Sequence, residues 1–158
     1  MPVKFEDNTI KVEGELAAAC LAWLYEAAGE FQAQTQRNSP VDMGQLKGSW
    51  KYKVNDAALE AVIGSPLENA IWNEFGTGHY ALKGNGRKTP WYVPVDGFTG
   101  KKKPTYFGRV VVIRGKNGKF FYKTNGKRPR RSLYNSYISL KDKVPRALED
   151  KLRRMSGS

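Results

Sequence analysis

Apolar residues recur at helical intervals in the alanine-rich segment from Glu15 to Arg37. Five of them lie four, three, four and four positions apart and so fall on one face of an α-helix; they are Leu16, Cys20, Trp23, Ala27 and Phe31. Alanine has the highest helix propensity of all residues, which strengthens this interpretation. The helix must end before Pro40, because the residue that precedes a proline is pushed out of the helical region. The pattern predicts a long helix over residues 14–37.

Two segments with alternating apolar and polar residues follow and predict a pair of β-strands over residues 49–64. Asn55-Asp56 has the composition of the turn between them. Residues 67–75 return to helical spacing and predict a short helix. Before the strands, Asp42 and Gln45 stand at the spacing of a capping box, which predicts a short helical turn.

The second half of the chain begins with a glycine-rich, basic segment over residues 76–108, which we predict to be a long loop that is mobile in part. Within it, the segment around Pro94 can form an edge strand, since proline has no amide to donate to a ladder. Asn117-Gly118, a dipeptide favoured in type I′ turns, predicts a hairpin over residues 109–124. Apolar spacing predicts a C-terminal helix over residues 132–155, which Pro145 kinks or restarts.

This order of elements predicts an α+β protein, in which a long N-terminal helix and a C-terminal helix pack on a small, mainly antiparallel sheet. The chain has 158 residues, 40% of them hydrophobic, which suits a single domain over residues 1–158. No apolar run approaches the ~18 residues that a membrane helix needs, so we expect no contact with a membrane. The acidic N-terminus is not typical of a signal peptide. The single cysteine excludes an internal disulfide and favours a reducing compartment.

Charge is distributed unevenly along the chain, whose formal net charge is +12. Residues 1–79 hold 6 Lys and Arg against 11 Asp and Glu, whereas residues 80–158 hold 21 against 4. Such asymmetry is typical of a protein with a polyanionic partner, or of copies that stack an acidic face on a basic one. Net charge alone does not choose between these interpretations.

The segment NEFGTGHY, Asn73 to Tyr80, gathers a carboxylate, a hydroxyl and the only histidine around two glycines. Nucleophilic catalysis needs a nucleophile beside a base that a third group orients, and Thr77 and His79 share a face only loosely on an extended segment. A zinc site needs three or four ligands, which one histidine and one cysteine hardly supply. Glu68 and Glu74 form a conceivable carboxylate pair, but most carboxylates on helices are solvated. We therefore expect no enzyme, and no catalytic, cofactor-binding or metal site.

Nucleic-acid binding is the main alternative to a structural role. Two basic segments interleave cations with Tyr106, Phe107 and Tyr134, a mixture that can hold phosphates and stack bases. No helix-turn-helix, zinc-finger or RNA-recognition pattern accompanies them, so this contact would not read sequence. The basic residues that would face DNA or a protein partner are Lys101, Lys102, Lys103, Lys127, Arg128, Arg130 and Arg131.

Two motifs occur in order behind the alanine-rich helix: PVDMGQLKGSW, Pro40 to Trp50, and NAIWNEFGTG, Asn69 to Gly78. Together they resemble the tail-component family of lambda-like long-tailed bacteriophages, whose members act in tail completion and head–tail joining. The resemblance spans roughly residues 15–155, and the hairpin over residues 109–124 looks like an insertion.

The resemblance implies a structural virion protein of the neck or tail end, assembled in the host cytoplasm, that forms a homo-oligomeric ring with six-fold rather than twelve-fold symmetry. Its partners would be neighbouring neck and tail-tube proteins, with non-specific contact to genomic DNA as a further option. NEFGTGHY would be a structural corner, because glycine permits φ > 0 where the chain turns. The residues assigned to this corner and to the subunit interface are Asp42, Gly44, Leu46, Trp72, Glu74, Phe75, Gly76, Thr77 and Gly78.

Overall fold

The computed structural model describes residues 9–41, 44–94, 112–114 and 120–157. Its elements in chain order are the helices α1 (Thr9–Asn38) and α2 (Gln45–Ser49), the strands β1 (Lys51–Asn55) and β2 (Glu60–Gly64), the helix α3 (Glu68–Phe75), the short 3₁₀ helix η1 (Gly78–Tyr80), the strands β3 (Trp91–Pro94), β4 (Val112–Arg114) and β5 (Phe120–Thr124), and the helices α4 (Ser132–Leu140) and α5 (Lys143–Ser156). The predicted α+β class is confirmed.

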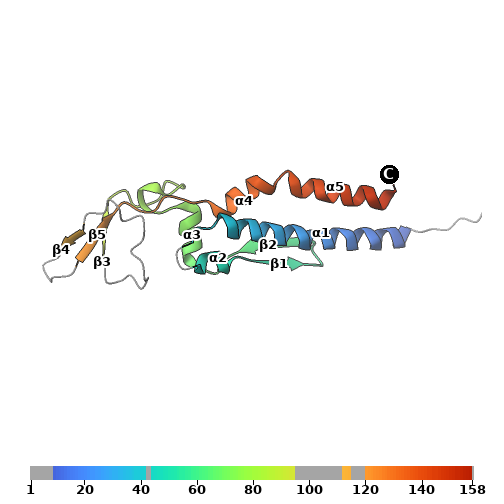
Figure 1. Ribbon diagram of the computed structural model, residues 1–158, viewed down its shortest axis with the longest axis horizontal. Helices are drawn as coiled ribbons and strands as arrows, with labels where there is room; N and C mark the ends of the chain where they lie inside the picture. Colours follow the sequence, from blue (N-terminus) through green and yellow to red (C-terminus); the bar gives the residue numbers. More distant parts are fainter. Residues whose placement is uncertain (1–8, 42–43, 95–111, 115–119, 158) are drawn as a thin grey trace, which may run out of the picture.

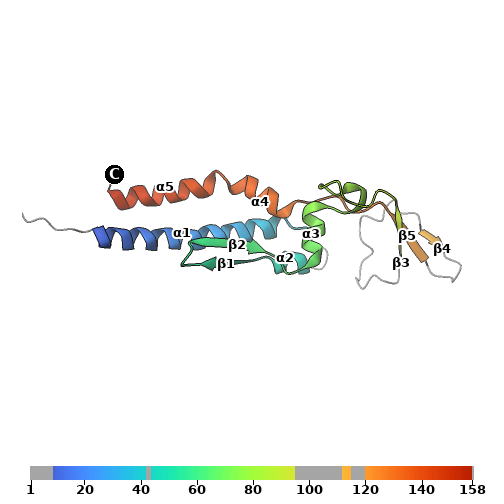
Figure 2. The same ribbon diagram turned by 180° about the vertical axis from the view of Figure 1, so that it is seen from behind.

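The molecule is elongated and is built along α1, as Figure 1 shows. Helices α4 and α5 run antiparallel to α1 on one side, and the β1–β2 pair lies on the other (Figure 1, Figure 2). Helices α2 and α3 lie at the end where α1 finishes, and beyond them β3, β5 and β4 project as a separate sheet. We call residues 76–131 the arm and the remainder of the chain the body.

Helix α1 has 30 residues, which at ~1.5 Å per residue makes it about 45 Å long. It begins at Thr9, before the predicted start, and ends at Asn38, two residues before Pro40. The predicted C-terminal helix is divided in two. The interruption lies at residues 141–142, ahead of Pro145, which falls in the first turn of α5 where a missing amide leaves no intrahelical bond unmade.

Small hydroxyl side chains line the seam between the C-terminal part of α1 and α4. Thr35, Ser132 and Ser136 are at most 1% exposed. The Ser136 hydroxyl donates to the Ser132 carbonyl at 2.7 Å and accepts from Asn38 Nδ2 at 2.9 Å. The Ser132 hydroxyl donates to the Asn38 carbonyl at 3.2 Å. These small side chains let the two helices approach closely, and each buried hydroxyl has a hydrogen-bond partner.

Both described sheets are antiparallel. Strand β1 pairs with β2, and the arm sheet has the order β3-β5-β4. Pro94 lies opposite Phe121 in the edge strand β3, which agrees with the sequence expectation for this proline. The loop predicted over residues 76–108 therefore contains η1 and β3 in its described part, and residues 95–108 lie outside the described residues. The two strands of the predicted hairpin pair as β4 and β5, whereas its Asn117-Gly118 turn is likewise outside them.

The apolar core of the described residues is small. Its buried hydrophobic members are Ala28, Leu46, Trp50, Ala70, Tyr122 and Leu140. By contrast, helices α1, α3, α4 and α5 and the β1–β2 pair all carry large apolar side chains that remain exposed. The fold thus leaves apolar surface uncovered, a feature that marks contact sites in soluble proteins when the exposed residues are contiguous.

Candidate functional site

The first sequence motif contributes to a hydrophobic cluster where α2, α3 and α4 meet. Leu46 and Trp50 pack with Ala70 of α3, and the partly buried Leu133 of α4 packs against them. The cluster joins elements from distant parts of the chain, so it fixes where α3 and α4 lie relative to the end of α1. Leu46 is buried within the chain, at 7% exposure, and contributes to the core. The sequence prediction grouped it with the residues of the structural corner and the subunit interface.

Helix α2 begins differently from the sequence prediction. Its N-cap is Gly44, which has a left-handed φ of 77° and no side chain that could cap the helix. The capping box requires the N-cap at Asp42 and Gln45 at the third helical position, so the predicted register is wrong. Glycine adopts positive φ without a Cβ clash, and this conformation turns the chain into α2. Asp42 itself lies outside the described residues.

Hydrogen bonds connect this cluster to α1. Trp50 Nε1 donates to the Ser39 hydroxyl at 2.7 Å, and that hydroxyl donates to the Thr35 carbonyl at 2.7 Å. Trp50 and Ser39 are both buried, at 4% and 5% exposure. Burying an unpaired indole N–H or hydroxyl costs several kcal/mol in an apolar environment, roughly 2–7, and these bonds remove that cost.

The second motif contributes Glu74, which caps α4 from the neighbouring helix α3. Its Oε2 accepts from the Leu133 amide and its Oε1 from the Tyr134 amide, both at 2.9 Å. These amides lie in the first turn of α4, whose own N-cap residue, Arg131, provides no side-chain cap. First-turn amides lack intrahelical partners and carry the positive end of the helix dipole. Glu74 therefore supplies both an acceptor pair and a compensating charge.

Asn73 adds a second tie between α3 and the segment that enters α4. Its carbonyl accepts from the Arg130 amide at 2.6 Å and from the Arg131 amide at 3.2 Å. Arg131 has a left-handed φ of 55°, unusual for a residue with a side chain, and it turns the chain into α4. The junction of α3 and α4 is thus held both by the Asn73 backbone carbonyl and by the Glu74 side chain.

Gly76 allows the chain to leave α3 in close contact with the segment that returns from the arm. Its φ of 72° and ψ of 176° lie in a region that is essentially restricted to glycine. A Cβ at this position would lie 2.8 Å from Pro129 Cδ, 2.8 Å from the Tyr80 carbonyl oxygen and 2.9 Å from the Lys127 carbonyl oxygen. The position therefore requires glycine both for its backbone angles and for space.

Thr77 joins the two ends of the arm. Its amide donates to the Lys127 carbonyl and its hydroxyl accepts from the Lys127 amide, both at 2.9 Å. The His79 amide donates to the Asn125 carbonyl at 2.8 Å, which extends this pairing. Gly78, which is buried with φ 59°, lies so close to the returning segment that a Cβ there would clash with the Asn125 carbonyl oxygen.

Four cations of the arm and its base lie over aromatic rings. The distances from the charged group to the ring centroid are 3.7 Å for Arg131 on Tyr134, 5.0 Å for Arg128 on Tyr80, 5.1 Å for Lys83 on Phe75 and 5.7 Å for Arg87 on Trp91. Such contacts orient a cation without neutralising its charge. The arm therefore presents positioned positive groups.

The side chains of Glu74 and Thr77 in NEFGTGHY are engaged in holding the chain together. Both Glu74 oxygens accept amides of α4, and the Thr77 hydroxyl accepts the Lys127 amide. The exposed His79 meets the ring of Tyr80 edge-on, with the centroids 5.5 Å apart. Among the described residues, no three His, Cys, Asp or Glu side chains gather at a distance suited to a metal ion.

The remaining predicted site residues divide into exposed and undescribed ones. Trp72 and Phe75 are exposed, at 46% and 41%, and so are accessible to a partner. Lys101, Lys102 and Lys103 lie outside the described residues. Sequence reasoning missed Leu133 and Gly126 because their partners lie in segments distant along the chain. A Cβ on Gly126, whose φ is 111°, would clash with the Thr77 carbonyl.

Among the helices that the structure describes, none combines the length and apolar character that a membrane span requires.

Searches of curated proteins and of solved structures found no match. A family model does match: residues 4–76 correspond to the HK97-gp10-like family, described as "Bacteriophage HK97-gp10, putative tail-component". The matched part contains α1, the β1–β2 pair, both motifs through Gly76, and Glu74, whereas the arm beyond Gly76 and the helices α4 and α5 lie outside it. The similarity to a bacteriophage tail-component family that the two motifs predicted is thereby confirmed for residues 4–76.

Proposed function

We propose that this chain is a non-enzymatic structural subunit of a phage tail, which forms a ring that completes the tail and joins it to the head. The family match over residues 4–76 supports a tail component. The observation that carries the finer proposal is the amount of large apolar surface that the small core leaves exposed. A protein that functions as a monomer rarely keeps such surface in contiguous patches, whereas a subunit covers it on assembly.

One apolar patch lies at the junction of body and arm. It consists of Ile71, Trp72 and Phe75 on one side of α3 together with Leu82, whose amide donates to the Phe75 carbonyl at 2.9 Å. Ile71 and Leu82 are 60% and 51% exposed. We call these four residues the α3 patch. Tryptophan and phenylalanine are enriched at protein interfaces, which favours a protein contact for this surface.

A second apolar surface lies at the opposite end of the body (Figure 1). The first half of α1 exposes Val12 and Leu16, which lie four positions apart on one face of the helix, and also Ile10, which points to another side. A rotationally symmetric ring needs two different surfaces on each subunit, because each copy presents one patch to the preceding copy and another to the next. Separate patches on α3 and on the start of α1 meet this requirement, although each could also bind a neighbouring protein of the tail.

The proposal also includes that the subunit catalyses no reaction. Glu74 and Thr77, which have the residue types of a catalytic pair, are engaged with backbone amides that hold α4 and the arm in place. A carboxylate whose two oxygens both accept such bonds stabilises the fold. We therefore expect that replacing His79 by alanine leaves assembly intact.

Replacing Ile71 and Trp72 together by aspartate should prevent assembly while leaving the subunit folded. Both side chains are exposed, so their loss costs little within one chain, yet two charges in an interface core would be desolvated without partners. Native mass spectrometry of the wild type should give a single ring species, and the double variant should give monomers. Its melting temperature should stay close to that of the wild type.

The matched control is Met155→Asp, which places a charge at a comparably exposed apolar residue on α5. This variant should still assemble. A wild-type protein that stays monomeric at high concentration, and that antibody labelling does not find at the tail end of particles, would contradict the proposal.

A further inference from the structure

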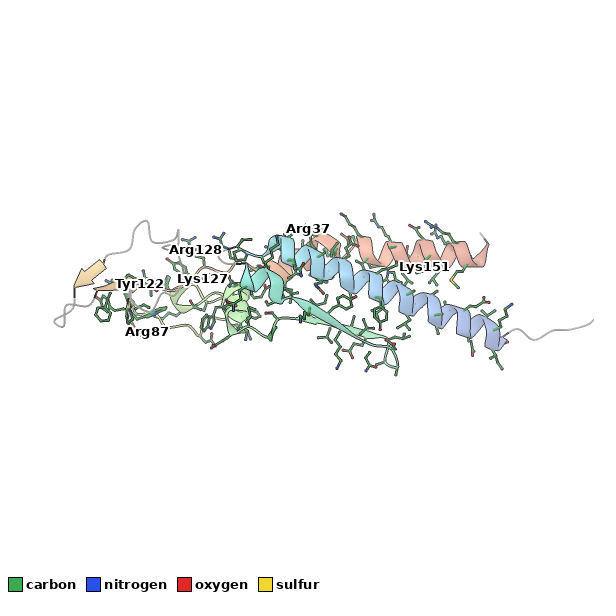
Figure 3. The ribbon with its side chains drawn as sticks, turned by 60° about the horizontal axis from the view of Figure 1, so that its bottom comes forward. Arg37, Arg87, Tyr122, Lys127, Arg128 and Lys151 are labelled. Atoms are coloured by element: carbon green, nitrogen blue, oxygen red, sulfur yellow. The ribbon has the colours of Figure 1, made fainter. Side chains whose placement is uncertain are left out.

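The described part of the arm contains basic side chains and no acidic ones. Residues 76–94 and 120–131 hold eight Lys and Arg and no Asp or Glu; the eight are Lys83, Arg87, Lys88, Lys123, Lys127, Arg128, Arg130 and Arg131. All of these are exposed except Arg131, which is half-buried. Figure 3 labels Arg87, Lys127 and Arg128, which lie on the arm, away from Lys151 on the body. The arm is therefore a projecting, almost uniformly positive surface.

A second copy of the chain does not match this charge. The body, residues 1–75 and 132–158, holds 12 Lys and Arg against 14 Asp and Glu, whereas the whole arm sequence holds 15 against a single Asp. The carboxylate closest in sequence to the start of the arm, Glu74, is already occupied by two amides of α4. A nearly neutral body would leave most of the arm's charge uncompensated, so a dense polyanion matches the arm better than a second copy of the chain does.

Duplex DNA is such a polyanion, with one phosphate per ~1.7 Å of helix axis. Arg128 and Arg87 rest on the rings of Tyr80 and Trp91, so their guanidinium groups are oriented but keep their charge. A guanidinium offers five N–H donors, and only some of them can face the ring. Arg87 Nε donates to the Thr89 hydroxyl at 3.1 Å, and both arginine side chains are exposed, so their other N–H groups can donate to phosphate oxygens.

We propose that the described part of the arm, residues 76–94 and 120–131, binds duplex nucleic acid through its phosphates and without sequence readout. In the described residues of the arm, the only helical element is η1, which is three residues long and too short to read bases from the major groove. The proposal is independent of the tail role, because it rests on the charge and exposure of the arm alone. An acidic protein surface is the competing partner, and the experiment below separates the two.

The test uses the purified full-length chain and a fluorescent duplex of ~30 base pairs, with binding followed by anisotropy between about 50 and 200 mM salt. The wild type should bind, and the logarithm of its association constant should fall linearly with the logarithm of salt concentration. The slope should be about −0.9 for each phosphate neutralised. Two unrelated duplex sequences should give the same affinity.

The arm variant replaces Arg87, Lys123, Arg128 and Arg130 by glutamine. It should bind the duplex at least about tenfold more weakly, and its slope should be smaller by about 3 to 4. The matched control replaces four exposed cations of the C-terminal region by glutamine, which removes the same charge from the body; they are Lys141, Lys143, Arg146 and Arg153. The control should retain the wild-type slope.

Equal losses in the two variants would overturn the proposal, since binding would then follow net charge and not the arm. Displacement of the duplex by poly-glutamate at an equal concentration of charge would also overturn it and would indicate an acidic protein partner. Native mass spectrometry of both variants without DNA measures ring assembly separately. Failure of assembly and failure of DNA binding are therefore distinguishable.

Discussion

Glu74→Ala should destabilise the protein by about 2–5 kcal/mol. Two amides of α4 lose a charged acceptor, and hydrogen bonds to charged groups contribute about 1.5–3 kcal/mol each, but water replaces part of this loss at the exposed Tyr134 amide. The loss should lower the melting temperature by roughly 5–15 °C for a chain of this length. Thermal unfolding followed by circular dichroism measures this change. Hydrogen exchange of the Leu133 and Tyr134 amides should also accelerate, because these are the donors that Glu74 accepts.

Glu68→Ala is the matched control for this prediction. Glu68 belongs to the same helix, is exposed and lies in the first turn of α3, where its charge is worth at most about 1 kcal/mol. It should leave the exchange of the α4 amides unchanged. If the two alanine variants had the same melting temperature and the α4 amides exchanged hydrogen at the same rate in both, the capping role of Glu74 would be refuted.

Gly76→Ala should destabilise the protein by about 2–6 kcal/mol. A left-handed or extended positive-φ conformation costs a residue with a side chain about 1–3 kcal/mol, and forcing an atom into a packed site costs about 1–3 kcal/mol more. The added Cβ would meet Pro129 and two backbone carbonyl oxygens at 2.8–2.9 Å. Chemical denaturation of the purified variant measures the loss of stability.

Gly84→Ala separates these two contributions. Gly84 has a φ of 71°, almost the same as that of Gly76, but an added Cβ meets nothing within 4 Å. This variant should therefore lose only the backbone contribution, on the order of 1 kcal/mol. Equal losses at Gly76 and Gly84 would mean that contact with the returning segment contributes nothing to stability.

Features that depend on local sequence were predicted well. The alanine-rich apolar face gives α1, alternation gives β1 and β2, and the glycines after Phe75 have positive φ. These follow from propensity and backbone geometry, which a few neighbouring residues determine. The capping box failed because its local spacing fits Asp42, whereas the surrounding packing begins α2 after Gly44.

The role of Glu74 could not be predicted in full. Sequence reasoning assigned it to the structural corner or the subunit interface, but the amides from which it accepts hydrogen bonds belong to Leu133 and Tyr134 in a helix that is distant along the chain. When the capping residue belongs to another element, no local sequence pattern marks it. The number of residues between it and the capped helix depends on the length of the intervening segment. For the same reason, the sequence did not predict the close approach of Gly126 to the Thr77 carbonyl.

The distribution of charge was noticed in the sequence but divided at the wrong place. Halving the chain assigns α4 and α5 to the basic part, although they pack along α1 in the body. The structure divides the charge between body and arm, and this division makes the arm far more basic than either helix. Spatial neighbours and not sequence neighbours determine which partner a charged surface can bind.

Thr77 and Lys127 join the two ends of the arm: the Thr77 amide donates to the Lys127 carbonyl, and the Thr77 hydroxyl accepts from the Lys127 amide. Asn73 and Glu74 hold the start of α4 in place. None of their hydrogen-bond partners there lies in the segment between Thr77 and Lys127. Evolution could therefore lengthen, shorten or exchange the segment between Thr77 and Lys127 while the junction of α3 and α4 stays intact. A tail assembly could in this way change what one of its parts touches without redesigning how that part is built.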